Sequence, residues 1–123
     1  MDVQVVLSSD EIINGLKHYR GIAKQDLLRA SETENPELFR IHAEARREIY
    51  AQLAELAEKL SPSDVAKEAL RFYQELPFVS GMAEPTNIHL KARESALENF
   101  FLMIGLEPKI RREIRSLRQP LES

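Results

Sequence analysis

The longest helical pattern of apolar and polar positions runs from Pro36 to Leu60. At about 100° per residue, apolar side chains cover roughly half of the helix circumference. We therefore expect a central helix with two surfaces to bury. Arg46 lies inside the apolar arc beside His42 and Tyr50, where an unpaired charge is costly to desolvate, so it requires a partner. The arc consists of Leu38, Phe39, His42, Ala43, Ala45, Ile49, Tyr50, Leu53, Ala54, Leu56, Ala57 and Leu60.

Capping signals divide the rest of the chain into further helices. Ser8 and Glu11 have capping-box spacing, Asn35-Pro36 and Ser61-Pro62 place a cap before a proline, and Gly105 is a stop signal. The pattern predicts an all-α fold, a four- to five-helix bundle in one domain, 1–123. Its parts are an extended arm at 1–8, helices at 9–30, 36–60, 62–76, 87–104 and 108–118, and a tail at 119–123.

One apolar connection separates two of these predicted helices. Residues 77–86 contain Gly81 and Pro85 but also Phe78, Val79 and Met82, whose exposure to water would be unfavourable. We therefore expect this connection to pack against the bundle.

Composition narrows the class of protein. The 123 residues, of which 43% are hydrophobic and 30% charged, suit one soluble helical domain. The chain has no cysteine, which excludes disulfides and thiolate chemistry. The N-terminus carries acids where a signal peptide carries bases, and no apolar run reaches the roughly 18 residues of a membrane span. We expect a cytoplasmic protein without membrane association.

A polar cluster is predicted where the first two long helices form an antiparallel hairpin. The hairpin brings Asp26 near His42 and Tyr19 near Arg46, with Tyr50 beside them. Such a group could be an acid/base site in which a carboxylate orients a histidine. It could also be a buried polar network that fixes helix register or is closed by a dimer partner, and we favour this interpretation. We predict that Asp26 and Arg46 are buried and paired, with His42 in hydrogen-bonding reach.

The three histidines give little support to a metal site. His18, His42 and His89 come from three predicted helices, but no HExxH, HxxxH or Glu-x-x-His spacing accompanies them. We predict neither a metal nor a cofactor.

The C-terminal segment concentrates positive charge. Residues 109–118 hold five basic side chains and one acid, a net +4 within a chain of net −3. The segment 102–118 partly matches a helix-turn-helix, although the preceding Phe101 is large where a small residue is usual and Ile110 comes about one residue too early after Gly105. The bases could contact nucleic-acid phosphates, or satisfy the helix dipole and neighbouring acids. We expect the arginines to be exposed and Ile110, Ile114 and Leu117 to be covered; the basic set is Lys109, Arg111, Arg112, Arg115 and Arg118.

Three functions remain open from the sequence. The leading hypothesis is an interaction or regulatory module that forms a homo-oligomer, most simply a dimer, or binds another protein, because the apolar supply exceeds what a simple bundle conceals. The second is a nucleic-acid-binding regulator that uses the basic helix. The third is a small enzyme or ligand-binding site around Asp26, His42 and Arg46.

Overall fold

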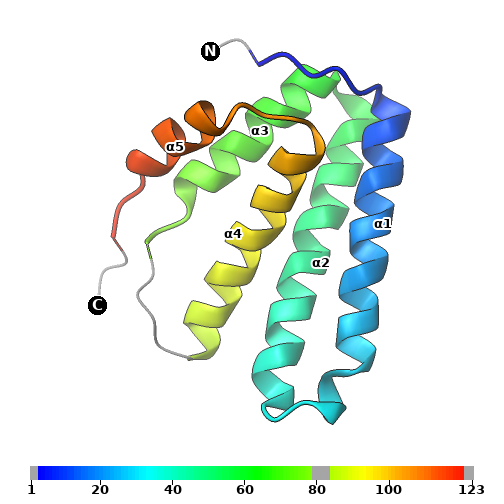
Figure 1. Cartoon of the computed structure of the whole chain (residues 1–123), viewed down its shortest axis with the longest axis vertical. Helices are drawn as coiled ribbons and strands as arrows, with labels where there is room; N and C mark the ends of the chain where they lie inside the picture. The colour runs from blue at the N-terminus through cyan, green and yellow to red at the C-terminus, as the bar shows by residue number, and fades with distance from the viewer. Residues whose placement is uncertain (1–2, 79–83, 121–123) are drawn as a thin grey trace.

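The computed structural model describes residues 3–78 and 84–120, which form five α-helices and one turn of 3-10 helix (Figure 1). This confirms the predicted all-α bundle. The elements are α1 (Ser9–Leu28), η1 (Ala30–Glu32), α2 (Pro36–Lys59), α3 (Pro62–Glu75), α4 (Pro85–Met103) and α5 (Pro108–Ser116).

The helix starts follow the predicted capping chemistry. The Ser8 hydroxyl accepts a hydrogen bond from the Glu11 amide at 3.2 Å, while the Ser8 amide donates to the Glu11 carboxylate at 3.1 Å. The Ser61 hydroxyl accepts from the Asp64 amide at 3.2 Å. Each bond satisfies an amide that has no partner within its helix. Helix α4 begins at Pro85, two residues earlier than predicted, because proline suits the first helical turn.

The end of α4 is a Schellman motif. Gly105 has a φ of 70°, which glycine adopts without strain. The Leu106 amide donates to the Phe101 carbonyl at 3.0 Å, and the Gly105 amide donates to the Leu102 carbonyl at 3.2 Å. These bonds satisfy the last carbonyls of α4 and turn the chain toward α5.

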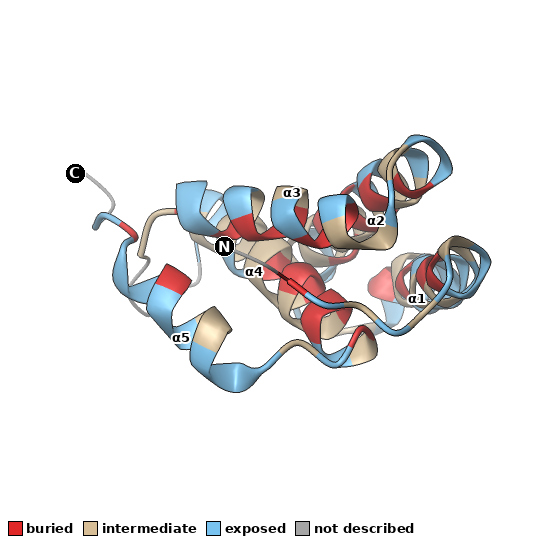
Figure 2. Ribbon diagram, turned by 90° about the horizontal axis from the view of Figure 1, so that it is seen from above, coloured by how far each residue is buried: buried red, intermediate tan, exposed pale blue. Residues whose placement is uncertain are grey.

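Helix α2 packs between α1 and α4, while α5 packs against α3 (Figure 1). Viewed from above, the buried faces of α2, α3 and α4 turn toward one another (Figure 2). Gly15 of α1 leaves room for the Met103 side chain of α4, because a Cβ at Gly15 would overlap the sulfur of Met103. The largest fully buried side chains are Tyr50, Tyr73, Phe100, Phe101, Ile12, Leu16, Ile49, Leu53, Leu97 and Val65.

Both ends of the described chain are tied to the bundle. In the predicted arm, Val3 is buried and its carbonyl accepts from the Ser63 hydroxyl at 2.7 Å. The tail prediction is wrong for its first two residues, because the Phe78 amide donates to the Gln119 carbonyl at 2.9 Å and Phe78 forms a β-bridge with Pro120. Within the connection after α3, Phe78 packs as predicted, with the Arg118 guanidinium carbon 4.8 Å from its ring centroid. The other residues of interest in that connection, Val79 and Met82, and residues 121–123 lie outside the described residues.

Candidate functional site

The α1–α2 hairpin brings the predicted pair together. A terminal guanidinium nitrogen of Arg46 donates to the Asp26 carboxylate at 2.7 Å, which confirms the predicted pairing. The side chain of Arg46 is 13% exposed and that of Asp26 is 34% exposed. The pair is therefore buried on its arginine side and open to solvent on its carboxylate side.

His42 does not complete an acid/base pair. Among the hydrogen bonds of the described residues, none joins His42 to Asp26 or Arg46, so that prediction is wrong. Asp26 instead pairs with Arg46, one helical turn further along α2 than His42, which the hairpin alignment placed beside it. Burial, then the charge of Arg46, lowers the pKa of His42, and Asp26 only partly opposes this. Near neutral pH this lowered pKa favours the neutral imidazole of His42.

Two tyrosines and an asparagine extend the cluster across three helices. The Tyr19 and Tyr50 rings stack with centroids 5.4 Å apart. The Tyr50 hydroxyl accepts from the Asn99 side-chain amide of α4 at 3.0 Å, and burial raises the pKa of Tyr50. Sequence reasoning missed Asn99, because an amide on a half-buried helix face carries no distinguishing pattern. The Nε of Arg46 is buried without a hydrogen-bond partner.

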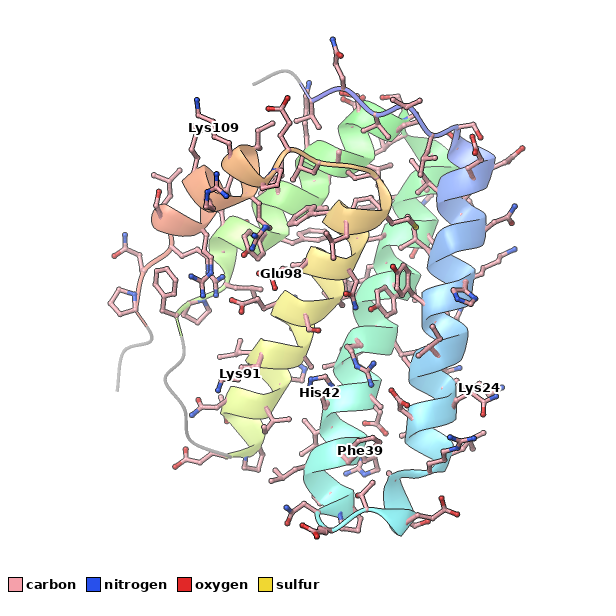
Figure 3. All side chains as sticks on the ribbon, viewed as in Figure 1. Lys24, Phe39, His42, Lys91, Glu98 and Lys109 are labelled. Atoms are coloured by element: carbon pink, nitrogen blue, oxygen red, sulfur yellow. The ribbon has the colours of Figure 1, made fainter. Side chains whose placement is uncertain are left out.

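A hollow opens beside this cluster, at the turn end of the hairpin. Its volume is about 550 Å³, within the range of small-molecule sites. His42 lies on the side of α2 that faces α4 (Figure 3). It lines the hollow together with Phe39. The exposed surface of the wall is mainly apolar, and His42 is one of four polar residues in it. The lining residues are Thr33, Glu34, Asn35, Leu38, Phe39, His42 and Ile88.

The C-terminal basic segment is organised around a buried arginine, contrary to prediction. The side chain of Arg118 is 2% exposed. Its Nε donates to the Leu76 carbonyl at 2.7 Å, one terminal nitrogen donates to Glu94 at 2.5 Å, and the other donates to the Pro77 carbonyl at 2.9 Å. The side chain lies inside because all three guanidinium nitrogens find acceptors there, two carbonyls at the end of α3 and the Glu94 carboxylate of α4.

Aromatic rings complete the environment of Arg118. Its guanidinium carbon lies 5.1 Å from the Tyr73 ring centroid and 4.8 Å from that of Phe78, which is cation-π geometry. The Tyr73 hydroxyl donates to Glu98 at 2.7 Å. Burial, then this bond, raises the pKa of Tyr73 to about 12.

The remaining bases of the segment divide into engaged and free side chains. Arg111 pairs with Glu98 at 3.3 Å, and the Arg115 guanidinium carbon lies 5.2 Å from the Phe78 centroid. Lys109 and Arg112 are exposed and make no ion pair within the described part of the chain. Leu117 is 55% exposed rather than covered, since α5 ends at Ser116. Two of the five bases, Arg111 and Arg118, are therefore neutralised by acids of α4.

Three further findings concern metal sites, membrane spans and similarity to known proteins. Residues 3–78 and 84–120 hold no group of three or more His, Asp or Glu side chains placed to bind a metal ion. No helix among those residues is long and apolar enough to cross a membrane. No protein-family model, curated protein or solved structure matches this chain.

Proposed function

We propose that this chain is a small helical binding module that forms a homodimer through the hollow at the turn end of the α1–α2 hairpin. The observation that carries the proposal is the apolar surface there. Phe39 lines the hollow and is 37% exposed although it is a large apolar side chain, and Leu38 and Ile88 add to the apolar wall. Leu28 and Ile22 of α1 are exposed apolar side chains outside this lining. Covering such surface releases ordered water and favours association.

Charge balance around the hollow favours a second copy of the chain as the occupant. Residues 24–40 carry three basic and four acidic side chains, a net formal charge of −1. Two copies of this surface can therefore meet about a twofold axis with little net repulsion, as an isologous dimer requires. The basic α5 surface would repel its own copy.

Sedimentation equilibrium at micromolar concentration tests the proposal. We expect twice the 14.1 kDa chain mass. The dimer should bury at least about 1,000 Å², as stable interfaces do. Phe39→Glu places a charge in the interface and should give monomers. Leu117→Glu is the matched control, because Leu117 is an exposed apolar residue on another part of the molecule. A monomeric wild-type protein would contradict the proposal.

A small-molecule ligand is a second candidate for the same hollow. The volume suits one, and neutral His42 has an imidazole that makes no hydrogen bond in the described residues. The Asp26–Arg46 pair would then support the site from behind rather than react, because Arg46 already engages the carboxylate. Ligand screening by NMR, with Phe39→Glu as the variant that alters the hollow, tests this candidate. A ligand that binds the wild type while its mass stays monomeric would favour it over dimerisation.

Nucleic-acid binding is the remaining alternative. It would rest mainly on exposed Lys109 and Arg112, since Arg118 is buried and Arg111 is paired. Absence of DNA and RNA binding at low salt would remove it, because phosphate contacts are strongest there.

A cytoplasmic location also remains our proposal.

A further inference from the structure

The side of α4 that faces α5 and the C-terminal segment carries a row of charged side chains about one helical turn apart. Glu98 accepts from Arg111 and Tyr73, and Glu94 accepts from Arg118. Lys91 continues this row, three residues before Glu94 (Figure 3). The row therefore contains two acids that are engaged by arginines and ends in a base.

A second hollow lies at this end of the row, with a volume of about 290 Å³. Its wall contains three basic side chains and one acid, an excess of two positive charges. Arg118 and Glu94 neutralise each other, which leaves Lys91 and Arg115 without an acidic partner in the described residues. The full lining is Phe78, Leu90, Lys91, Glu94, Arg115 and Arg118.

We propose that this hollow binds a small phosphorylated molecule, with the phosphate held by Lys91 and Arg115. A phosphate monoester carries about −1.5 to −2 charge at neutral pH, which matches the excess positive charge of the lining. Its three acceptor oxygens suit both an ammonium group and a guanidinium fork. Neighbouring Phe78 and Leu90 offer an apolar wall to the organic part of the molecule.

The surrounding contacts prepare Arg115 and the hollow for an anion. Arg115 is already placed over the Phe78 ring at 5.2 Å. Phe78 is held by its backbone hydrogen bond to Gln119 and by the cation-π contact of Arg118 with its ring. Less side-chain entropy is then lost when a ligand binds, so affinity improves. This site is independent of the proposed dimer surface, with which it shares no lining residue.

The test is a titration of the full chain with inorganic phosphate and with phenyl phosphate, followed by calorimetry and by amide NMR shifts. We expect one saturable site, with shifts at Leu90, Lys91 and Arg115 and tighter binding of phenyl phosphate. Lys91→Gln and Arg115→Gln should each weaken binding about tenfold, because each removes a charge-assisted bond.

Arg112→Gln is the matched control, since Arg112 is an exposed, unpaired base on α5 outside the hollow. It should bind phosphate like the wild type. Thermal melts identify any variant that fails to fold, and exposed Lys91 supplies the variant least disturbing to the fold. If titration to about 10 mM phosphate produces no saturable shift, any binding is very weak and the proposal is overturned. So would equal weakening by Arg112→Gln, or preferential binding of a single-stranded oligonucleotide through Lys109 and Arg112.

Discussion

Arg46 and Arg118 are both largely withdrawn from water, but the protein satisfies them differently. Arg118 donates from its Nε and both terminal nitrogens, to two backbone carbonyls and one carboxylate. Arg46 makes one ion pair, and its buried Nε has no partner. Burying a charge is tolerated when its donors are paired, so Arg118 is the more fully satisfied of the two.

The location of free carbonyls explains the difference. Leu76 is the C-cap of α3 and Pro77 follows it, so their carbonyls have no partner within that helix. Arg118 therefore caps α3 with a positive charge at the negative end of its dipole. Arg46 lies in the middle of α2, where backbone carbonyls are already bonded within the helix. Helix ends, rather than helix middles, provide acceptors for a buried arginine.

Arg118→Ala should have the largest effect on stability. The change leaves Glu94 and two carbonyls without their donor, and we expect a loss of about 3 to 5 kcal/mol in the free energy of unfolding. Urea denaturation measures it. Arg118→Lys keeps the charge but not the planar fork, so an intermediate loss should result. A loss below about 1 kcal/mol would mean that Arg118 contributes no more than an ordinary residue.

Arg46→Ala should cost less, about 1 to 2 kcal/mol, because solvent reaches the Asp26 carboxylate and weakens the pair. A double-mutant cycle with Asp26→Asn and Arg46→Met isolates the interaction. We expect the double variant to recover part of the single-variant losses. If Arg46→Ala cost as much as Arg118→Ala, the contrast between the two arginines would fail.

The tyrosines beside the two arginines provide a finer comparison. Tyr73 donates to a carboxylate, whereas Tyr50 accepts from a neutral amide. Charge-assisted bonds are the stronger kind, so Tyr73→Phe should cost about 1 to 2 kcal/mol and Tyr50→Phe about 0.5 to 1 kcal/mol. Both variants keep the buried ring, which makes each the control for the other in denaturant unfolding. The reverse order would contradict the proposed ranking.

The smallest predicted effect is a pH dependence from His42. The pKa of His42 in the folded state lies below its ordinary value. Between these two pKa values the unfolded chain therefore binds more protons than the folded chain. Stability is therefore fully present above about pH 6.5, the unfolded value, and falls as pH drops through the folded pKa. Unfolding free energies of wild type and His42→Gln, compared between about pH 7.5 and 5.5, measure this contribution. A slope unchanged by His42→Gln would show that His42 does not contribute.

The sequence predicted the elements whose causes are local. Capping at Ser8 and Ser61 and the glycine stop at Gly105 are written in three to six neighbouring residues, and each was confirmed. The Asp26–Arg46 pair was also predictable, because both residues interrupt apolar helix faces that a short turn brings together.

The arrangement around Arg118 was not predictable in the same way. Its acceptors include two backbone carbonyls, 42 and 41 residues earlier in the chain, and every residue has such a carbonyl. The exposed position of Leu117 has a different cause, because α5 ends at Ser116, before the apolar stripe does. Tertiary contacts of this kind become visible only once the helices are placed.

The bond between the Phe78 amide and the Gln119 carbonyl has a consequence for the order of folding. It closes a loop that contains α4 and α5, at an entropic cost of about 3 kcal/mol for roughly 40 residues. The α1–α2 hairpin, in contrast, joins neighbouring segments across a short turn. Contacts of low sequence separation form quickly, whereas distant ones wait until the intervening chain is ordered. We therefore expect the hairpin to form first and the closure at Phe78 to be the last step of folding and the first to open.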